Sequence, residues 1–155
     1  MELIYQVYIL FLGQLLISNR INDKLSLQIS PVFVKRNYNQ ERLLIENGEV
    51  VFTDGIPTFT TYDRENNYLL GISTSYKINK RTALNFEYYA NLNRVSTSTN
   101  ADTLSIGIDI ETGGHVFQLV FSNNQSMDDI SSIIGAEGDW SERHVFFGFN
   151  ILRVF

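Results

Sequence analysis

Histidine often binds metals or transfers protons, and this chain of 155 residues contains two, His115 and His144. Glu111 lies four residues before His115, across a predicted tight turn, so its carboxylate could approach the imidazole. Catalysis or metal binding would also require a nucleophile or further ligands at the same place. A polar turn accounts for both residues without such partners. We therefore expect no catalytic site, no metal site and no cofactor.

The other candidate chemistry lies in carboxylates that alternate with apolar residues. Glu87, Asp109 and Glu111 occupy the polar positions of two such segments. Inside a barrel they would face the lumen and bias it toward cations. A hydrogen-bonded interior network with neighbouring polar residues is the alternative, and we favour it. The full set of lumen-facing candidates is Asn85, Glu87, Tyr89, Asp109, Glu111 and Gln118.

A hairpin over residues 104–121 must position several of these side chains. Its first half alternates apolar and polar residues, the period of two typical of a strand with one apolar face. Gly113 and Gly114 can adopt the positive φ angles of a two-residue turn. The resulting register pairs Ile106 with Phe121, Ile108 with Leu119, Ile110 with Phe117, and Asp109 with Gln118. A shift by one residue would move the large apolar side chains to opposite faces.

The same alternation recurs along the chain, in segments 25–33, 70–77, 84–91 and 144–151. No segment has a helical apolar stripe with caps at both ends. We predict an all-β chain of about seven antiparallel strands, each roughly 9–12 residues long, enough to cross a bilayer at a tilt. Helix is expected to be short and confined to loops.

The connections between these segments alternate in length. The short connections are 19–23, 79–81 and 112–115, and the long ones are 37–67, 93–102 and 123–143. Outer-membrane barrels have short periplasmic turns and long extracellular loops, with the C-terminus in the periplasm. All six connections follow that pattern. The acidic side chains of the long loops lack the spacing of a calcium loop, so we expect them to be solvated.

Composition limits the function classes. The chain has no cysteine, which excludes disulfides and thiolate metal sites. Its net charge of −5 argues against a nucleic-acid partner, which requires a basic face. The mean hydropathy of −0.07 is no guide, because alternating strands average to near-neutral values even in membrane barrels. Residues expected in interfacial aromatic girdles are Tyr8, Tyr68, Tyr76, Tyr88 and Trp140.

The last strand is rich in aromatic residues and ends the chain. Phe147, Phe149, Ile151 and Phe155 share one face, as in the terminal signal that outer-membrane assembly machinery recognises. Arg153 lies on the same face. It must therefore sit near the headgroups, where its cost is about 0–1 kcal/mol instead of the roughly 2–4 kcal/mol expected at the midplane. The last strand of a soluble sandwich is the alternative.

Several strings occur in an order that resembles an uncharacterised family of Gram-negative outer-membrane β-barrel proteins, a domain of unknown function. They are Gln14-Leu-Leu-Ile17, Lys24-Leu-Ser-Leu-Gln-Ile-Ser-Pro31, Leu70-Gly-Ile-Ser73, Leu104-Ser-Ile-Gly-Ile-Asp-Ile-Glu-Thr-Gly-Gly-His-Val-Phe-Gln-Leu119, Gly138-Asp-Trp140 and Phe147-Gly-Phe-Asn-Ile-Leu-Arg-Val-Phe155. The resemblance covers roughly residues 13–155 outside the loop at 39–65. It implies a barrel in the outer membrane, with the lipid bilayer and the assembly machinery as partners. It implies no reaction and no functional residues.

Members of that family are longer, with a signal peptide and further strands before the matched region. Residues 1–12 have neither the basic start nor the small-residue cleavage site of a signal peptide. We interpret residues 3–18 as a strand, with a degenerate signal or an interfacial helix as the alternative.

The fold class is thus an antiparallel up-and-down (meander) transmembrane β-barrel of 7–8 strands, or the C-terminal part of one. We expect residues 1–155 to form one domain, with long loops at 39–66 and 123–143. Seven strands suggest the C-terminal portion of a barrel of about 12 strands. Alternatively, residues 1–18 or the long loop supply an eighth strand, or another chain completes the sheet.

Three functions fit this sequence. We expect an outer-membrane barrel with a structural or solute-passing role that is not an enzyme. A soluble β-barrel that binds a small apolar ligand is the second hypothesis. A barrel enzyme acting on lipid or envelope substrates is the third, and the sequence shows no nucleophile–histidine–carboxylate set that would favour it.

Overall fold

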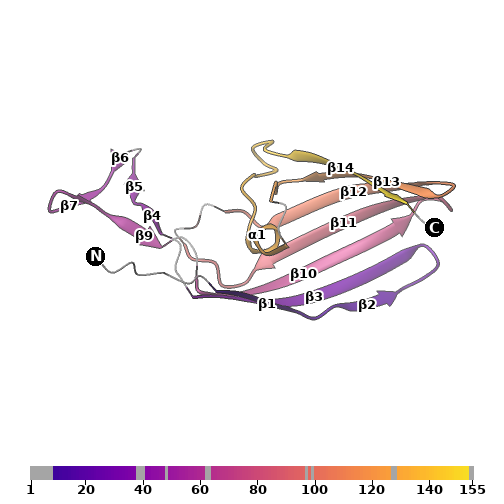
Figure 1. Cartoon of the computed structure of the whole chain (residues 1–155), viewed down its shortest axis with the longest axis horizontal. Coiled ribbons are helices and arrows are strands. Elements are labelled where there is room, and N and C mark those ends of the chain that lie inside the picture. Colours follow the sequence, from indigo (N-terminus) through magenta and orange to yellow (C-terminus); the bar gives the residue numbers. More distant parts are fainter. Residues whose placement is uncertain are drawn as a thin grey trace, which may run out of the picture.

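Most of the chain forms one curved antiparallel sheet in the computed structural model (Figure 1). The structure describes residues 9–37, 41–47, 49–61, 64–96, 98, 100–126 and 129–153. Along the sheet the order is β1 (Leu10–Gln14), β3 (Leu25–Arg36), β10 (Asn66–Lys77), β11 (Thr82–Asn91), β12 (Thr103–Thr112), β13 (His115–Ser122) and β14 (Phe146–Arg153). β2 (Ile17–Arg20) continues β1 along the same edge of β3. The predicted all-β meander of seven strand positions is confirmed.

The predicted hairpin has the expected register. Ile108 pairs with Leu119 and Asp109 with Gln118, and the flanking apolar pairs follow. Gly113 and Gly114 form the turn with φ angles of +56° and +126°, which residues with side chains rarely adopt. β13 and β14 have 8 residues each, slightly fewer than predicted, while β3 and β10 have 12.

The first edge strand is interrupted. The sequence predicted one continuous strand over residues 3–18, and the structure instead has two, β1 and β2. Leu15 N–H donates to the carbonyl of Pro31 at 3.1 Å, so Pro31 faces this edge. Proline has no N–H to return the bond, and the ladder breaks between β1 and β2. β2 then extends to Arg20. Residues 3–8 lie outside the described part of the chain.

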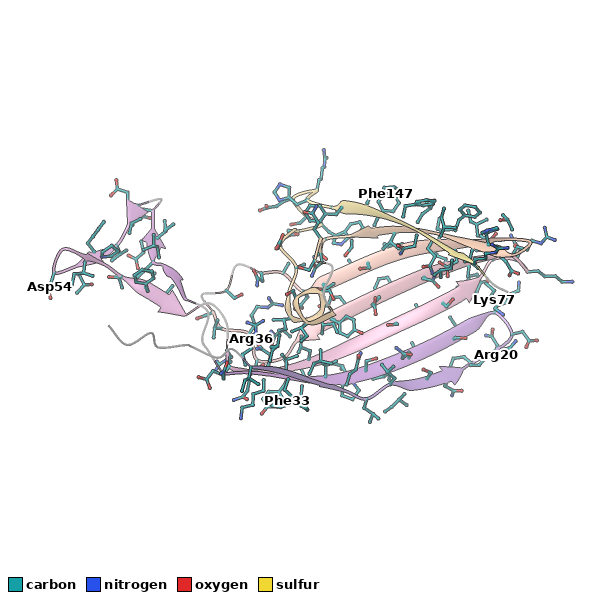
Figure 2. The ribbon with its side chains drawn as sticks, in the orientation of Figure 1. Arg20, Phe33, Arg36, Asp54, Lys77 and Phe147 are labelled. Atoms are coloured by element: carbon teal, nitrogen blue, oxygen red, sulfur yellow. The ribbon has the colours of Figure 1, made fainter. Side chains whose placement is uncertain are left out.

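The two faces of the sheet differ sharply in chemistry. Directly opposed residues share a face, and the pairs that involve Ile108, Leu84 and Leu119 continue as apolar rows across the sheet. We call this outward face the apolar belt: Leu25, Leu27, Ile29, Phe33, Tyr68, Leu70, Ile72, Tyr76, Leu84, Phe86, Tyr88, Leu104, Ile106, Ile108, Ile110, Phe117, Leu119, Phe121, Phe147, Phe149 and Ile151. Figure 2 shows Phe33 and Phe147 on the outward side of the sheet.

The short and long connections lie at opposite ends of the sheet, as predicted. We call these the turn end and the long-loop end. Arg153 pairs with His115 beside the Gly113–Gly114 turn, so it lies on the outward face at the turn end. Lys35 marks the other end, opposite Phe11 and Asn66. Between these two residues the outward face carries no charged side chain in the described strands.

The long connection between β3 and β10 contains short strands that the sequence analysis did not predict. β4 (Glu41–Leu43) pairs with β9 (Phe59–Thr61), β5 (Ile45–Glu46) with β6 (Glu49–Val50), and β7 (Phe52–Thr53) with β8 (Ile56–Pro57). They form an arm that projects from the long-loop end, with Asp54 at its tip (Figures 1 and 2). Asp54 and Gly55 have φ angles of +53° and +79°, which suit a two-residue hairpin turn.

The last long loop folds back against the sheet. Its helix α1 (Asp129–Ile134) lies inside the curve of the sheet (Figure 1). Ile133 and Ile134, 7% and 4% exposed, pack in one cluster with Val32, Val34 and Leu69. This loop was expected to be solvated, and its central part is instead buried, because its isoleucines meet apolar residues on the concave face. The expectation of a short helix confined to a loop is confirmed.

The sheet is open. Within the described residues, β14 pairs only with β13, and β1 and β2 pair only with β3. The expected eighth strand is therefore not supplied by residues 9–18, which already form the first edge, nor by the arm, whose strands pair among themselves.

Candidate functional site

The concave face of the sheet is the candidate site, because it gathers polar side chains opposite the apolar belt. All six residues singled out in the sequence, Asn85, Glu87, Tyr89, Asp109, Glu111 and Gln118, lie on this face. Their neighbours there include Gln28, Ser30, Ser73, Ser75, Ser105 and Ser122. We call the surface they form the inner face.

Pairs of neighbouring strands are linked across the inner face by side-chain hydrogen bonds. Gln118 Nε2 donates to Asp109 Oδ1 at 3.2 Å, and Ser73 Oγ donates to Glu87 Oε1 at 3.3 Å. The hydroxyls of Ser105 and Ser122 are 2.9 Å apart. In the described residues, no buried side-chain nitrogen or oxygen lacks a partner. The buried polar groups of the inner face thus have partners, and two of the predicted network residues, Asp109 and Gln118, are bonded to each other.

Glu87 holds a distinctive position on this face. Its cross-strand row consists of Ser73 and Gln28 on one side and Ser105 and Ser122 on the other, so Glu87 carries the formal charge of that row. Asp109 has a different setting. It and Lys77 both flank Ala83, so its cross-strand row also carries a positive charge.

Two cavities open onto Glu87. One of about 460 Å³ lies between the sheet and the loop that carries α1, and its lining is mostly hydroxyl and amide groups, with some apolar residues. The lining residues are Leu12, Gln14, Glu87, Tyr89, Thr103, Ser105, Val120, Ser122, Asn124, Ser126, Ser132 and Ile133. A second cavity of about 350 Å³ extends toward the turn end along Ser18, Gln28, Ser75 and Asn85. Glu87 lines both cavities.

The Tyr89 side chain on β11 contacts residues of two other strands, β1 and β10. Gln14 Nε2 donates to the Tyr89 hydroxyl at 3.1 Å. The ring lies over Gly71, where an added Cβ would come within 2.3 Å of a ring carbon. Only glycine leaves this space, which is why a glycine interrupts the β10 pattern at that point.

Two side chains, one in β12 and one in the loop after β13, fix the position of α1 by bonding carbonyl groups at its C-terminal end. Thr103 Oγ donates to the Ser132 carbonyl at 2.6 Å. Asn124 Nδ2 donates to the carbonyls of Ser132 and Gly135 at 3.1 and 3.3 Å. The last carbonyls of a helix have no partner within it, so these bonds hold a six-residue helix that would not be stable alone.

The loop between β11 and β12 is fastened at the same end by Asp102. Arg94 donates to its carboxylate at 2.5 Å and Tyr88 at 2.7 Å, and the backbone N–H of Asn91 donates at 3.1 Å. Partial burial raises the pKa of Asp102, but these hydrogen bonds outweigh it and hold the pKa below its ordinary value. Ala101 in turn pairs with Ala136 of the last loop, so the two loops are tied together.

The two histidines are not brought together. His115 lies at the turn end, and His144 lies in the loop at the other end, 3.5 Å from Glu142. An approach of Glu111 to His115 was considered possible from the sequence, although a polar turn was favoured. The register places them on opposite faces, because Glu111 pairs with Val116 and His115 with Thr112. Among the described side chains, no group of three or more His, Asp or Glu could hold a metal ion.

The terminal strand presents its aromatic residues outward. Phe147, Phe149 and Ile151 are 61%, 51% and 54% exposed. Phe117 and Phe149 stack with ring centroids 6.3 Å apart, and Phe121 and Phe147 lie 5.2 Å apart. Phe155, the last residue of the predicted signal, lies outside the described residues.

One comparison identifies relatives of this chain. The family model described as "Membrane bound beta barrel domain (DUF5777)" matches residues 8–155. No curated protein and no solved structure matches. In the described part of the chain, no helix has the length and apolar content needed to cross a membrane.

Proposed function

Because the chain belongs to the family of membrane-bound beta barrel domains of unknown function, we propose that it forms part of the wall of a porin-like barrel in the outer membrane of a Gram-negative cell. The inner face would line the lumen, and small polar solutes would pass along it without catalysis. The lipid bilayer would contact the apolar belt, and assembly machinery would read the terminal strand.

One observation carries this proposal: the outward face of the sheet is apolar from β3 to β14, whereas the inner face is mostly polar, with a local apolar cluster where α1 packs. A soluble protein would cover such an apolar face with a second layer. Here the outward face has no such layer in the described residues, and its side chains are widely exposed, for example Ile17 at 56% and Tyr68 at 52%. The soluble apolar-ligand hypothesis needs the opposite arrangement, with an apolar interior.

The height of the apolar belt supports a transmembrane position. On β10 it runs from Tyr68 to Tyr76, eight steps of about 3.3 Å, or roughly 26 Å along the strand. At a tilt of about 40° this projects to roughly 20 Å, close to the ~25 Å band of membrane barrels. The tyrosines at its two ends would then lie at the two interfaces.

The asymmetry of the connections supports the outer membrane and its orientation. Short turns lie at one end with the C-terminal strand, and the arm and the two other long loops lie at the opposite end (Figure 1). In outer-membrane barrels the turns are periplasmic and the long loops extracellular. In that orientation α1 would narrow the extracellular entrance, and Glu87 would lie deeper in the path.

The charges of the inner face predict a preference for cations that depends on Glu87. Arg20 and Lys77 lie at the turn end and Arg36 at the long-loop end (Figure 2). Glu87 lies between them, in a row without another formal charge. A permeating cation within about 10 Å in water gains roughly 0.4 kcal/mol from one carboxylate, or about twofold in occupancy.

The test is ion selectivity of the assembled barrel in a planar bilayer. Glu87→Gln is expected to lower the cation-to-anion permeability ratio by roughly fourfold, because the cation loses and the anion gains about twofold in occupancy. Asp109→Asn is the matched control and should change it less, because the cross-strand row of Asp109 also contains Lys77. Equal effects of the two substitutions would contradict the assignment. A bilayer with no conductance would favour a structural role with a packed interior.

A further inference from the structure

The open edges of the sheet specify what must complete the barrel. β14 and the β1–β2 edge each have one strand neighbour in the described residues. Their outward side chains are apolar and exposed, Phe11 at 56% and Phe147 at 61%. Unpaired backbone N–H and carbonyl groups are not tolerated in lipid. If the chain lies in a membrane as proposed above, both edges must be paired there.

The directions of the two edge strands limit the partner. Six antiparallel steps separate β1 from β14, so these two strands run in the same direction. Closing the sheet on itself would therefore make a parallel pair. A second copy in the same membrane orientation presents edges that run the same way, so every junction between copies would also be parallel. Bacterial single-chain barrels are antiparallel throughout, with an even number of strands.

Helix α1 sets a minimum number of strands for the completed barrel. An eight-stranded barrel has an interior just wide enough for its own side chains. Here the inner face also carries α1, whose Ile133 and Ile134 are buried against Val34 and Leu69. A helix with its side chains is about 10 Å across, so one added strand would leave it no room.

We propose that the barrel is completed by a sheet segment of odd strand number, three or more, whose two outer strands run opposite to β1 and β14. This segment is not a second copy of the chain. Its outward positions are apolar, to continue the belt, and its inward positions are polar. The proposal rests on the membrane position proposed above. It adds that the segment that completes the barrel wall has an odd number of strands.

Strand parity can be tested by appending copies of this chain's own strands ahead of the full chain, through a flexible linker. Residues 82–122 supply three strands, copies of β11, β12 and β13, and both outer ones run opposite to the edges. Residues 103–122 supply two strands and residues 66–122 supply four. Each of these controls places a strand parallel to β14. The four-strand control is longer than the three-strand segment, so added length alone does not distinguish the fusions.

After refolding in detergent micelles, the three-strand fusion is expected to give a compact species that resists SDS until heated. Hydrogen exchange of the β14 amides should slow at least tenfold relative to the unextended chain. The controls should show neither change. The proposal is overturned if either control closes as effectively as the three-strand fusion. It is also overturned if the three-strand fusion does not close. If the apolar belt does not face lipid, the fusions and the unextended chain should all stay soluble without detergent. Failure of the membrane assignment is therefore distinguishable from failure of the strand-parity proposal.

Pairing between copies has a separate test, because the chain contains no cysteine. Asn150→Cys in β14 and Ser18→Cys in β2 are refolded as a mixture and oxidised. The proposal predicts no disulfide between copies. The double variant Ser105→Cys, Ser122→Cys is the control, since these two hydroxyls lie 2.9 Å apart on neighbouring strands and a disulfide should form there. A disulfide between copies with the efficiency of that control would show that a second copy closes the barrel.

Discussion

Ile108→Arg is expected to lower the free energy of unfolding from a bilayer by about 2–4 kcal/mol. Ile108 lies on the outward face of β12, an inner strand of the sheet, between Leu84 and Leu119. A guanidinium there would face hydrocarbon near the midplane, far from both interfaces. Denaturant titration of the protein refolded into liposomes measures the change.

The matched control for this substitution is Gln118→Arg. Gln118 pairs with Asp109, the residue after Ile108, so it lies at almost the same depth but on the inner face. There the guanidinium would meet the Asp109 carboxylate and water, and the expected change is below about 1 kcal/mol. Equal losses for the two variants would mean that the two faces do not differ in environment, which would contradict the lipid assignment of the belt.

The double substitution Ile133→Ala, Ile134→Ala is expected to release the last loop from the inner face. Both side chains are at least 93% buried, and truncating a buried isoleucine costs about 2–5 kcal/mol. Even a local loss of about 2 kcal/mol raises the open population of the loop roughly 30-fold. Hydrogen exchange of the amides in 129–138 measures this change, and conductance of the assembled barrel should rise because the path past Glu87 widens.

Glu137→Ala provides the control within the same loop, because Glu137 is exposed. It should leave the exchange of the loop unchanged. The strands β10–β12 should keep their protection in both variants, since their ladders do not depend on α1. Comparable exchange in the control and the double variant, or loss of protection in the sheet instead of the loop, would contradict the role given to α1.

The sheet could be predicted from the sequence because its signal is local and repeated. Each strand alternates by itself, and Gly113–Gly114 fixes the register of one hairpin, so the pairing of Ile108 with Leu119 follows without tertiary information. The break in the first strand follows from Pro31, but only when the partner edge is known. The six inner-face residues share one face for the same reason of period two.

The inward position of α1 could not be predicted in this way. Ile130, Ile133 and Ile134 have helical spacing, a signal that was present but too short to stand alone. Their partners Val32 and Val34 lie a hundred residues earlier, on a face where most positions are polar. Such a contact depends on the curvature of the whole sheet.

The arm carried a clearer signal that was missed. Asp54-Gly55 between two short apolar runs is typical of a hairpin, and the structure forms β7 and β8 there. The anchoring by Asn124 and Thr103 had no sequence signature, because their acceptors are backbone carbonyls, which any residue type supplies.

Spin labels along β10 test the central claim most directly, and the absence of cysteine allows single-site labelling. The positions are Leu70, Ile72 and Thr74 on the outward face and Ser73 and Ser75 on the inner face. For the protein in liposomes, the account predicts that the outward labels are accessible to oxygen dissolved in the membrane and the inner labels to a water-soluble nickel chelate, with a period of two. Equal accessibility of all five labels to the chelate would contradict a lipid-facing belt and a polar lumen.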